Sequence, residues 1–148
     1  MTIKAPRCAG SDRDAMLESK AKWLRIAFIA GAVTDGVAVL PMVLPALAKI
    51  LWGLDDMPSS FWFAMYYGAA LMLGWTGLLV WAAIRPIERR FVAVLTVLVV
   101  AGLMVAEAQA VNLGVIDARR LVPIAVLQSI LVLLFVAAYW GASAEHRP

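Results

Sequence analysis

The chain has 148 residues, of which 64% are hydrophobic and only 16% charged, and its mean hydropathy is +0.86. A soluble domain is about 45–50% apolar and about 25% charged, and a domain of this size leaves roughly a third of its chain surface in water. The excess apolar surface is therefore expected to face lipid. This excludes a soluble enzyme, a disordered chain and a secreted disulfide-rich domain, the last because Cys8 is the only cysteine.

Four apolar stretches are long enough to cross a hydrocarbon core of roughly 30 Å, which takes about 20 helical residues. Backbone amides in lipid must be hydrogen-bonded within their own segment, so each stretch is predicted to be a helix. Short polar connections make neighbours antiparallel. The sequence therefore predicts an all-α membrane protein, an up-down bundle of four transmembrane helices. The predicted spans are residues 24–48, 61–84, 91–112 and 121–140.

Residues 1–23 precede the first span and form a predicted cytoplasmic tail with an interfacial amphipathic helix. Met16, Leu17, Ala21 and Leu24 share one face of this helical extension. We interpret it as an extension of the first span along the membrane surface, with a partner-docking or lipid-sensing helix as the alternative. A second cytoplasmic tail is expected over residues 141–148.

The first span contains the strongest candidate for a functional residue, Asp35. It lies about 16 Å along the helix from Leu24, close to the membrane midplane. Small neighbours such as Gly31, with Thr34 adjacent to the acid, let another helix approach, so the carboxyl is expected to face inward. A lone buried acid is expected to hold its proton, as in a proton-coupled site or a structural hydrogen-bond donor. Pro41 and Pro45 are expected to kink this helix.

The second span carries small residues bounded by aromatic ones at helical spacing. This pattern is typical of close helix packing, and a ligand slot is the alternative. Trp75 is the one tryptophan placed deep in a span, and we include it with Tyr67 among the candidate binding residues. The patterned residues are Tyr67, Ala70, Gly74, Gly77 and Trp81.

The third span contains the second buried acid, Glu107, about 9 Å below Leu113 and nearer the outer face. It is a candidate proton-coupling residue; alternatively, Arg119 or Arg120 reaches down and pairs with it as a structural clamp. Gly102 and Ala106 form a predicted close-packing pair on the same helix, and Gln109 points nearly opposite to Glu107.

The fourth span contributes Gln128, which is predicted to lie at nearly the depth of Asp35 and to form a hydrogen bond with it. Pro123 fits the first turn of this helix, where no backbone hydrogen bond is lost.

Lysine and arginine residues lie mostly on one side of the predicted bundle. Five precede the first span and Arg25 lies at its start, three lie in the connection over residues 85–90 and one follows the last span. The other side holds only Lys49, Arg119 and Arg120. Because cytoplasmic flanks are enriched in these residues, we expect a multi-pass protein of the inner (cytoplasmic) membrane with both termini cytoplasmic. The net charge of +3 needs no nucleic-acid partner.

No motif for metal, cofactor or catalytic chemistry is found. His146 is the only histidine and Cys8 the only cysteine, and there is no Gly-rich phosphate loop or Gly-x-Ser-x-Gly elbow. We therefore expect no cofactor, no metal and no catalytic residues.

Two segments carry a resemblance. Residues 74–90 read GWTGLLVWAAIRPIERR, and residues 31–36 read GAVTDG. Both resemble a pattern in small bacterial four-helix membrane proteins of uncharacterised function, over most of the chain from Leu24 onward. The resemblance implies the fold and supplies no activity. Size and an acid in the first span are weakly similar to the small multidrug resistance exporters, which are shorter, use a glutamate and carry a motif missing here.

The sequence supports three hypotheses of function. The leading one is a non-enzymatic polytopic membrane protein that binds or assembles within the bilayer, as a homo-oligomer or as a subunit of a larger membrane complex, with membrane lipid around it. An alternative is a proton-coupled carrier of a small lipophilic or cationic ligand that uses Asp35 with Glu107. A third is an intramembrane lipid-modifying or isomerase enzyme that uses Asp35 and Tyr67.

Overall fold

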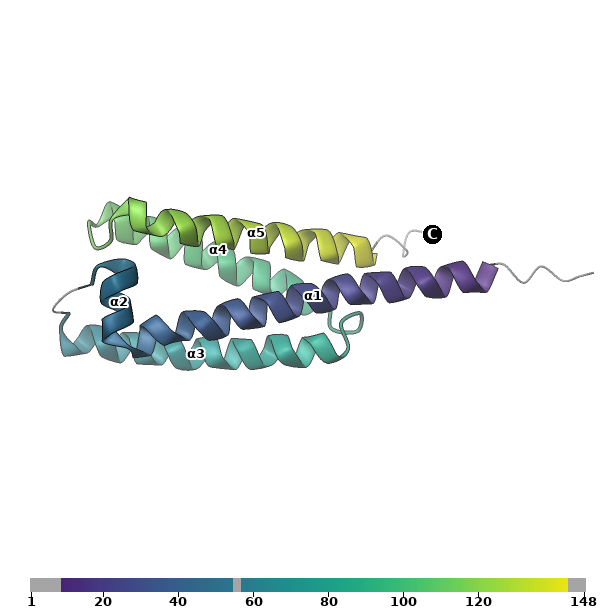
Figure 1. The fold of residues 1–148 in the computed structure, drawn as a ribbon, viewed down its shortest axis with the longest axis horizontal. Coiled ribbons are helices and arrows are strands. Elements are labelled where there is room, and N and C mark those ends of the chain that lie inside the picture. The colour runs from purple at the N-terminus through teal and green to yellow at the C-terminus, as the bar shows by residue number, and fades with distance from the viewer. Residues whose placement is uncertain (1–8, 55–56, 144–148) are drawn as a thin grey trace, which may run out of the picture.

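The computed structural model describes residues 9–54 and 57–143, and every element within these ranges is a helix. The expected all-α bundle is confirmed: four long helices lie side by side, and a short one lies across one end (Figure 1). We call this the α2 end, and the opposite end, where α1 begins and α5 finishes, the terminal end. The helices are α1 (Ala9–Val43), α2 (Pro45–Trp52), α3 (Ser59–Ile84), α4 (Phe91–Asn112) and α5 (Ala118–Ser143).

Four of these helices are long and apolar enough to cross a membrane. The stretch in α4 has the predicted bounds, and those in α3 and α5 begin slightly earlier than predicted. Only 17% of the stretch in α3 is buried inside the bundle, so most of its apolar surface is left for lipid. The stretches are Glu18–Val43, Ser59–Ile84, Phe91–Asn112 and Ala118–Gly141.

The first span ends earlier than the expected residues 24–48. The helix breaks at Leu44, whose backbone is extended (φ −113°, ψ 101°), and the chain turns into α2. Proline restricts the preceding residue to extended conformations and has no N–H to donate, so Pro45 explains the break. Pro41 lies inside α1 without ending it.

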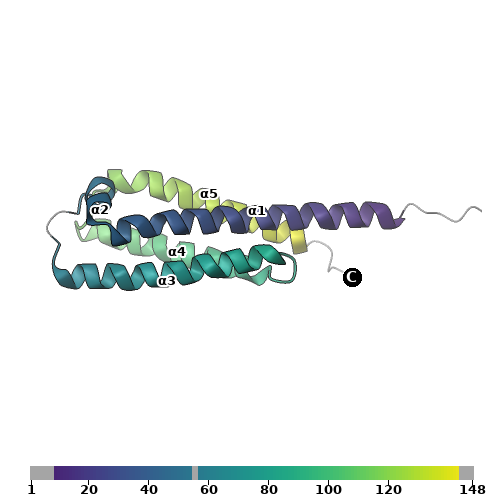
Figure 2. The ribbon, with the colours of Figure 1, turned by 60° about the horizontal axis from the view of Figure 1, so that its bottom comes forward.

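The N-terminal extension is continuous with the first span. Helix α1 runs unbroken from Ala9 and projects past the connection between α3 and α4 along the bundle axis (Figures 1 and 2). The expected helical extension before Leu24 is thus part of α1 and continuous with the first span. Its location at the membrane surface stays a prediction. Residues 1–8 and 144–148 lie outside the described residues.

The helices pack in the order α3, α1, α5, α4. Helix α1 packs along α3 and α5, α4 packs along α5, and the consecutive helices α3 and α4 hardly contact each other. The buried core gathers toward the terminal end, where the rings of Phe28 and Phe135 lie 5.9 Å apart. It comprises Leu24, Ala27, Phe28, Ala32, Leu79, Ala82, Val92, Ala93, Phe135 and Ala138.

Gly31 makes this core possible. Between helices in lipid the hydrophobic effect supplies little attraction, so association depends on close van der Waals packing. A Cβ at Gly31 would lie only 2.9 Å from Cζ of Phe135 and 3.2 Å from Cδ1 of Leu79. The absence of a side chain therefore lets α3 and α5 both approach α1, as the sequence led us to expect for this residue.

Two arginines hold the terminal end of α3. Arg25 of α1 donates from Nε to the carbonyl of Ala83 at 3.1 Å, and Arg89 donates to the carbonyl of Trp81. The Arg89 guanidinium also lies 3.5 Å from the centroid of the Trp81 ring. Carbonyls in the last turn of a helix have no partner within the helix, so these arginines satisfy groups that would otherwise need water.

Candidate membrane-embedded polar site

The polar site is built around a hydrogen bond between α4 and α5. Gln128 donates from Nε2 to Oε1 of Glu107 at 2.7 Å. The Gln128 side chain is buried, at 8% exposure, whereas Glu107 is half-buried. Two of the predicted site residues are therefore brought together, in a pair that the sequence analysis did not anticipate.

Asp35 lies about one helical turn from this pair along the bundle axis and forms no hydrogen bond with it. Gly31 of α1 packs against Phe135 of α5. Asp35 is four residues beyond Gly31 and Gln128 is seven residues before Phe135, which is about 6 Å and about 10 Å along their helices toward the α2 end. Gln128 therefore lies about one helical turn nearer the α2 end than Asp35.

The expected hydrogen bond between Asp35 and Gln128 is wrong. The carboxamide turns toward α4 and uses its N–H for Glu107. Asp35 is half-buried, and no described side chain gives it a hydrogen bond or an ion pair. The depth offset and the rotation of α5 toward α4 together explain the difference.

The expected clamp on Glu107 is also absent. Arg120 donates from Nη1 to the carbonyl of Ile50 at 3.2 Å and so holds α2, and the backbone N–H of Arg119 donates to Oδ1 of Asp117. Both arginines lie at the α2 end, and among the described residues the only side-chain partner of Glu107 is Gln128.

Trp75 lies at the depth of Asp35 on α3. A Cβ at Gly36 would lie 3.9 Å from Cγ2 of Thr76. Because α1 and α3 are antiparallel, Asp35 and Trp75 lie on either side of this contact, about 3 Å apart along the bundle axis. The Trp75 ring packs against the core, and its Nε1 is buried. Thr34, beside Asp35, is half-buried.

Two buried polar atoms near this level have no hydrogen-bond partner within the described residues: Nε1 of Trp75 and Oε1 of Gln128. A buried polar group without a partner costs about 1–3 kcal/mol. This part of the bundle thus carries two carboxyls, an unused amide acceptor and an unused indole donor, which are spread over α1, α3, α4 and α5. It can accept a proton or a hydrogen-bond donor, and the described residues contain no group of metal-ligating side chains.

Tyr67 is not part of this site. It precedes Thr76 on α3 by nine residues, about 13 Å toward the α2 end, and its side chain is exposed. The structure therefore does not bring Tyr67 and Asp35 together, and the intramembrane-enzyme hypothesis has no assembled pair of residues.

The small residues predicted to pack helices divide into two groups. Gly31 packs inside the bundle, whereas a Cβ at Gly74, Gly77 or Gly102 would meet nothing within 4 Å. Ala70 and Ala106 are exposed as well. A contact that the sequence analysis missed is Gly68, where a Cβ would lie 2.7 Å from Cε of Met42. Nothing in the hydropathy pattern distinguished this glycine from the outward-facing ones.

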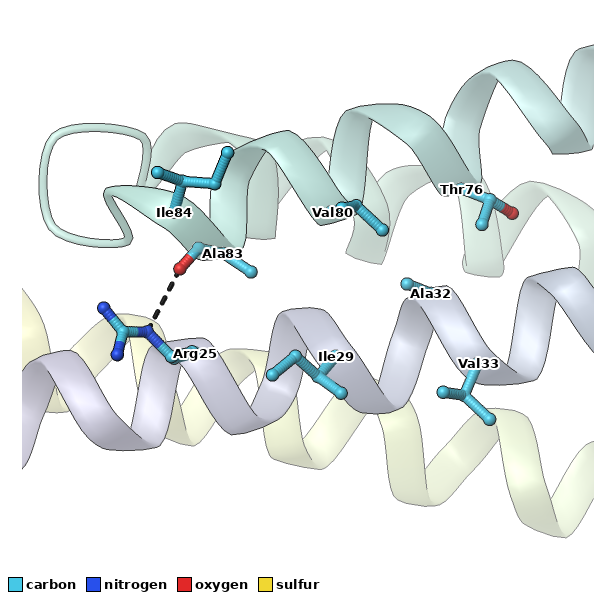
Figure 3. A pocket seen from close by; sticks show the side chains of 8 residues that line it. All are labelled: Arg25, Ile29, Ala32, Val33, Thr76, Val80, Ala83 and Ile84. Atoms are coloured by element: carbon cyan, nitrogen blue, oxygen red, sulfur yellow. Dashed lines mark hydrogen bonds between the residues drawn. The ribbon is translucent and has the colours of Figure 1, made fainter.

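A groove between α1 and α3 was also missed. It is apolar along most of its length, and Arg25 lies at one end of it (Figure 3). From the sequence, Arg25 was expected only as part of the basic flank of the first span. The nearby end of α3, with which Arg25 forms its hydrogen bond, gives this arginine a defined place.

Four apolar helices of spanning length in one bundle define a polytopic membrane protein. No family model, curated protein or solved structure matches the chain.

Proposed function

We propose that this polytopic membrane protein assembles within the bilayer, with a second copy of the same chain, through small-residue faces of α3 and α4. The observation that carries the proposal is on α4. Gly102 and Ala106 are exposed and adjacent on one face, and the side chain of Gln109 is exposed on the same face about one turn further. We call Gly102, Ala106 and Gln109 the α4 face.

Each part of the α4 face favours contact with another helix. Small residues let two backbones approach closely in lipid. A carboxamide has little to gain from hydrocarbon, and Gln109 has no side-chain hydrogen bond within the described residues. Hydrogen bonds between membrane helices contribute about 0.6 kcal/mol on average, so a partner helix offers both packing and a polar contact.

Helix α3 presents a similar surface. Ala70, Gly74 and Gly77 are exposed along one side of it, which we call the α3 face. Helices α3 and α4 are the outer members of the packing order and hardly contact each other. Their small residues are therefore unused in the single chain and open to a second one.

The proposal includes location and orientation. Within the described residues, the terminal end carries Arg25, Arg85, Arg89 and Arg90, whereas the α2 end carries Lys49, Arg119 and Arg120. Lys20 and Lys22 of α1 add to the terminal end. The excess of positive charge supports the inner membrane and a cytoplasmic terminal end.

Replacement of the small residues tests the assembly. We expect native mass spectrometry from mild detergent to show wild-type oligomers, and Gly102→Leu together with Gly74→Leu to give monomers. Both positions are open in the single chain, so helical content should be retained, as checked by circular dichroism. Gly141→Leu is the matched control, since Gly141 is also exposed with nothing within 4 Å of its Cβ position.

Two outcomes contradict the assembly proposal. One is a wild-type chain that is monomeric in membranes, as judged by cross-linking before extraction. The other is an oligomer that survives both substitutions as well as it survives Gly141→Leu.

A second candidate function is a proton-coupled carrier of a small lipophilic cation. The hydrogen bond between Glu107 and Gln128 supports it, because it holds one acid inside the apolar bundle about one turn from the level of a second acid, Asp35. Ionisable groups within spans are costly, at least about 2.5–3.5 kcal/mol on insertion scales, and are typical of ion and substrate pathways.

A further inference from the structure

The groove between α1 and α3 has an arginine at one end and is lined by apolar side chains along most of the rest. Ile29 and Val33 of α1 and Val80 and Ile84 of α3 line it, and Arg25 lies at its end (Figure 3). Thr76 also borders it, but its hydroxyl donates to the carbonyl of Met72 at 2.9 Å and is not free to donate to a ligand. From Arg25 toward the α2 end, the groove therefore favours the binding of a hydrocarbon chain.

Arg25 is held in place and lacks a counter-charge. Its Nε donates to the carbonyl of Ala83 at 3.1 Å, which leaves the terminal guanidinium nitrogens pointing away from the groove's length (Figure 3). The nearby carboxylates are engaged elsewhere: Glu18 pairs with Lys22 and Glu88 with Arg85. Among the described residues no acid pairs with Arg25. An oriented guanidinium with free N–H groups matches a phosphate.

The depth of the groove fits one leaflet of a bilayer. Arg25 lies at the level where α3 ends, and Val33 lies eight residues further, about 12 Å along α1. One leaflet contributes about 15 Å of hydrocarbon. A phosphate at Arg25 therefore places an attached acyl chain along the groove and within the same leaflet.

We propose that this groove binds an anionic phospholipid, with its phosphate on the Arg25 guanidinium and one acyl chain between α1 and α3. A phospholipid has a phosphate that can contact Arg25 and an acyl chain that can contact the apolar residues of the groove. A free phosphate has no apolar part that could fill the rest of the groove.

Lipid retention in native mass spectrometry tests the charged end. The protein in detergent receives phosphatidylglycerol or phosphatidylcholine with the same acyl chains. We expect wild type to retain more phosphatidylglycerol, and Arg25→Gln to bind it roughly tenfold more weakly, as expected for loss of a charge-assisted hydrogen bond. Phosphatidylcholine retention should fall less, because its choline cation already offsets the charge of its phosphate. Arg90→Gln is the matched control, an arginine at the same end outside the groove.

A second pair of variants tests the apolar length. Val33→Trp places a large side chain in the groove and should lower the retention of both lipids. Val37→Trp, one turn along α1 at an exposed position outside the groove, should leave retention as in wild type. This pair keeps the proposal falsifiable if Arg25→Gln disturbs the end of α3.

Three results would overturn the proposal. The first is equal retention of the two lipids by wild type. The second is unchanged phosphatidylglycerol retention in either Arg25→Gln or Val33→Trp. The third is displacement of phosphatidylglycerol by inorganic phosphate at comparable concentration, which would define a plain anion site. Preference for phosphatidylglycerol that depends on both Arg25 and Val33 and resists phosphate would support it.

Discussion

Glu107 and Gln128 illustrate how an apolar bundle accommodates a buried acid. The Gln128 N–H supplies one hydrogen bond to the carboxyl at 2.7 Å, and within the described residues Glu107 forms no ion pair. Asp35 forms no side-chain hydrogen bond within the described residues. The chain thus carries one supported and one unsupported acid in its membrane-spanning part, and the two proposed functions assign them different roles.

Uptake of a lipophilic cation distinguishes these roles. In vesicles with a proton gradient and ethidium as the probe, a carrier predicts gradient-dependent uptake by wild type that Glu107→Gln or Asp35→Asn reduces to the level of protein-free vesicles. Glu88→Gln, at an exposed carboxylate in the α3–α4 connection, is the control and should transport normally. Wild-type uptake no greater than in protein-free vesicles would contradict the carrier and leave assembly as the function.

The sequence could identify these residues but could not pair them. An acid or amide within an apolar run is evident from the sequence because of its insertion cost. Its partner depends on the rotation of each helix, and helices that are apolar on every side give no signal of rotation. Gln128 was therefore predicted to meet Asp35, and instead it faces Glu107.

At the scale of elements, α2 shows how one proline changes the path of the chain. Pro45 forces Leu44 into an extended conformation, and the eight residues that follow turn across the end of the bundle (Figure 1). The sequence indicated a kink at both prolines. It could not show which one breaks the helix, because a proline inside a membrane helix is tolerated where neighbouring groups satisfy the freed backbone.

Helix α2 is fastened to α5 by Arg120. Its Nη1 donates to the carbonyl of Ile50, and Gly53, in a left-handed conformation (φ 72°), ends α2 where a Cβ would lie 2.9 Å from Cζ of Arg120. We expect Arg120→Met to cost α2 about 1 kcal/mol of local stability. Amide hydrogen exchange over residues 46–53 should then be about fivefold faster, with little change in the four long helices.

Arg119→Met provides the comparison for this experiment. Among the residues that the structure describes, the Arg119 side chain forms no hydrogen bond, and its backbone N–H donates to Asp117. The side chain should therefore be dispensable for α2. Equal exchange over residues 46–53 in the two variants would show that Arg120 does not hold the helix.

At the scale of the whole molecule, the number of spanning helices was predictable because bilayer thickness sets their length. The packing order was not. Short connections predicted only that consecutive helices are antiparallel. In the structure α1 lies between α3 and α5, and α4 packs on α5. Gly31 contributes to this order, since α3 and α5 both approach α1 where it has no side chain.

The central claim is that these helices cross a membrane with the terminal end in the cytoplasm. Single cysteines in a Cys8→Ser background test this orientation most directly. One is Glu88→Cys in the α3–α4 connection, and the other is Val115→Cys in the α4–α5 connection. Both positions are exposed. We expect a membrane-impermeant maleimide to label Val115→Cys in cells with a permeabilised outer membrane, and Glu88→Cys only after the inner membrane is opened. Labelling of both before that step would contradict the account.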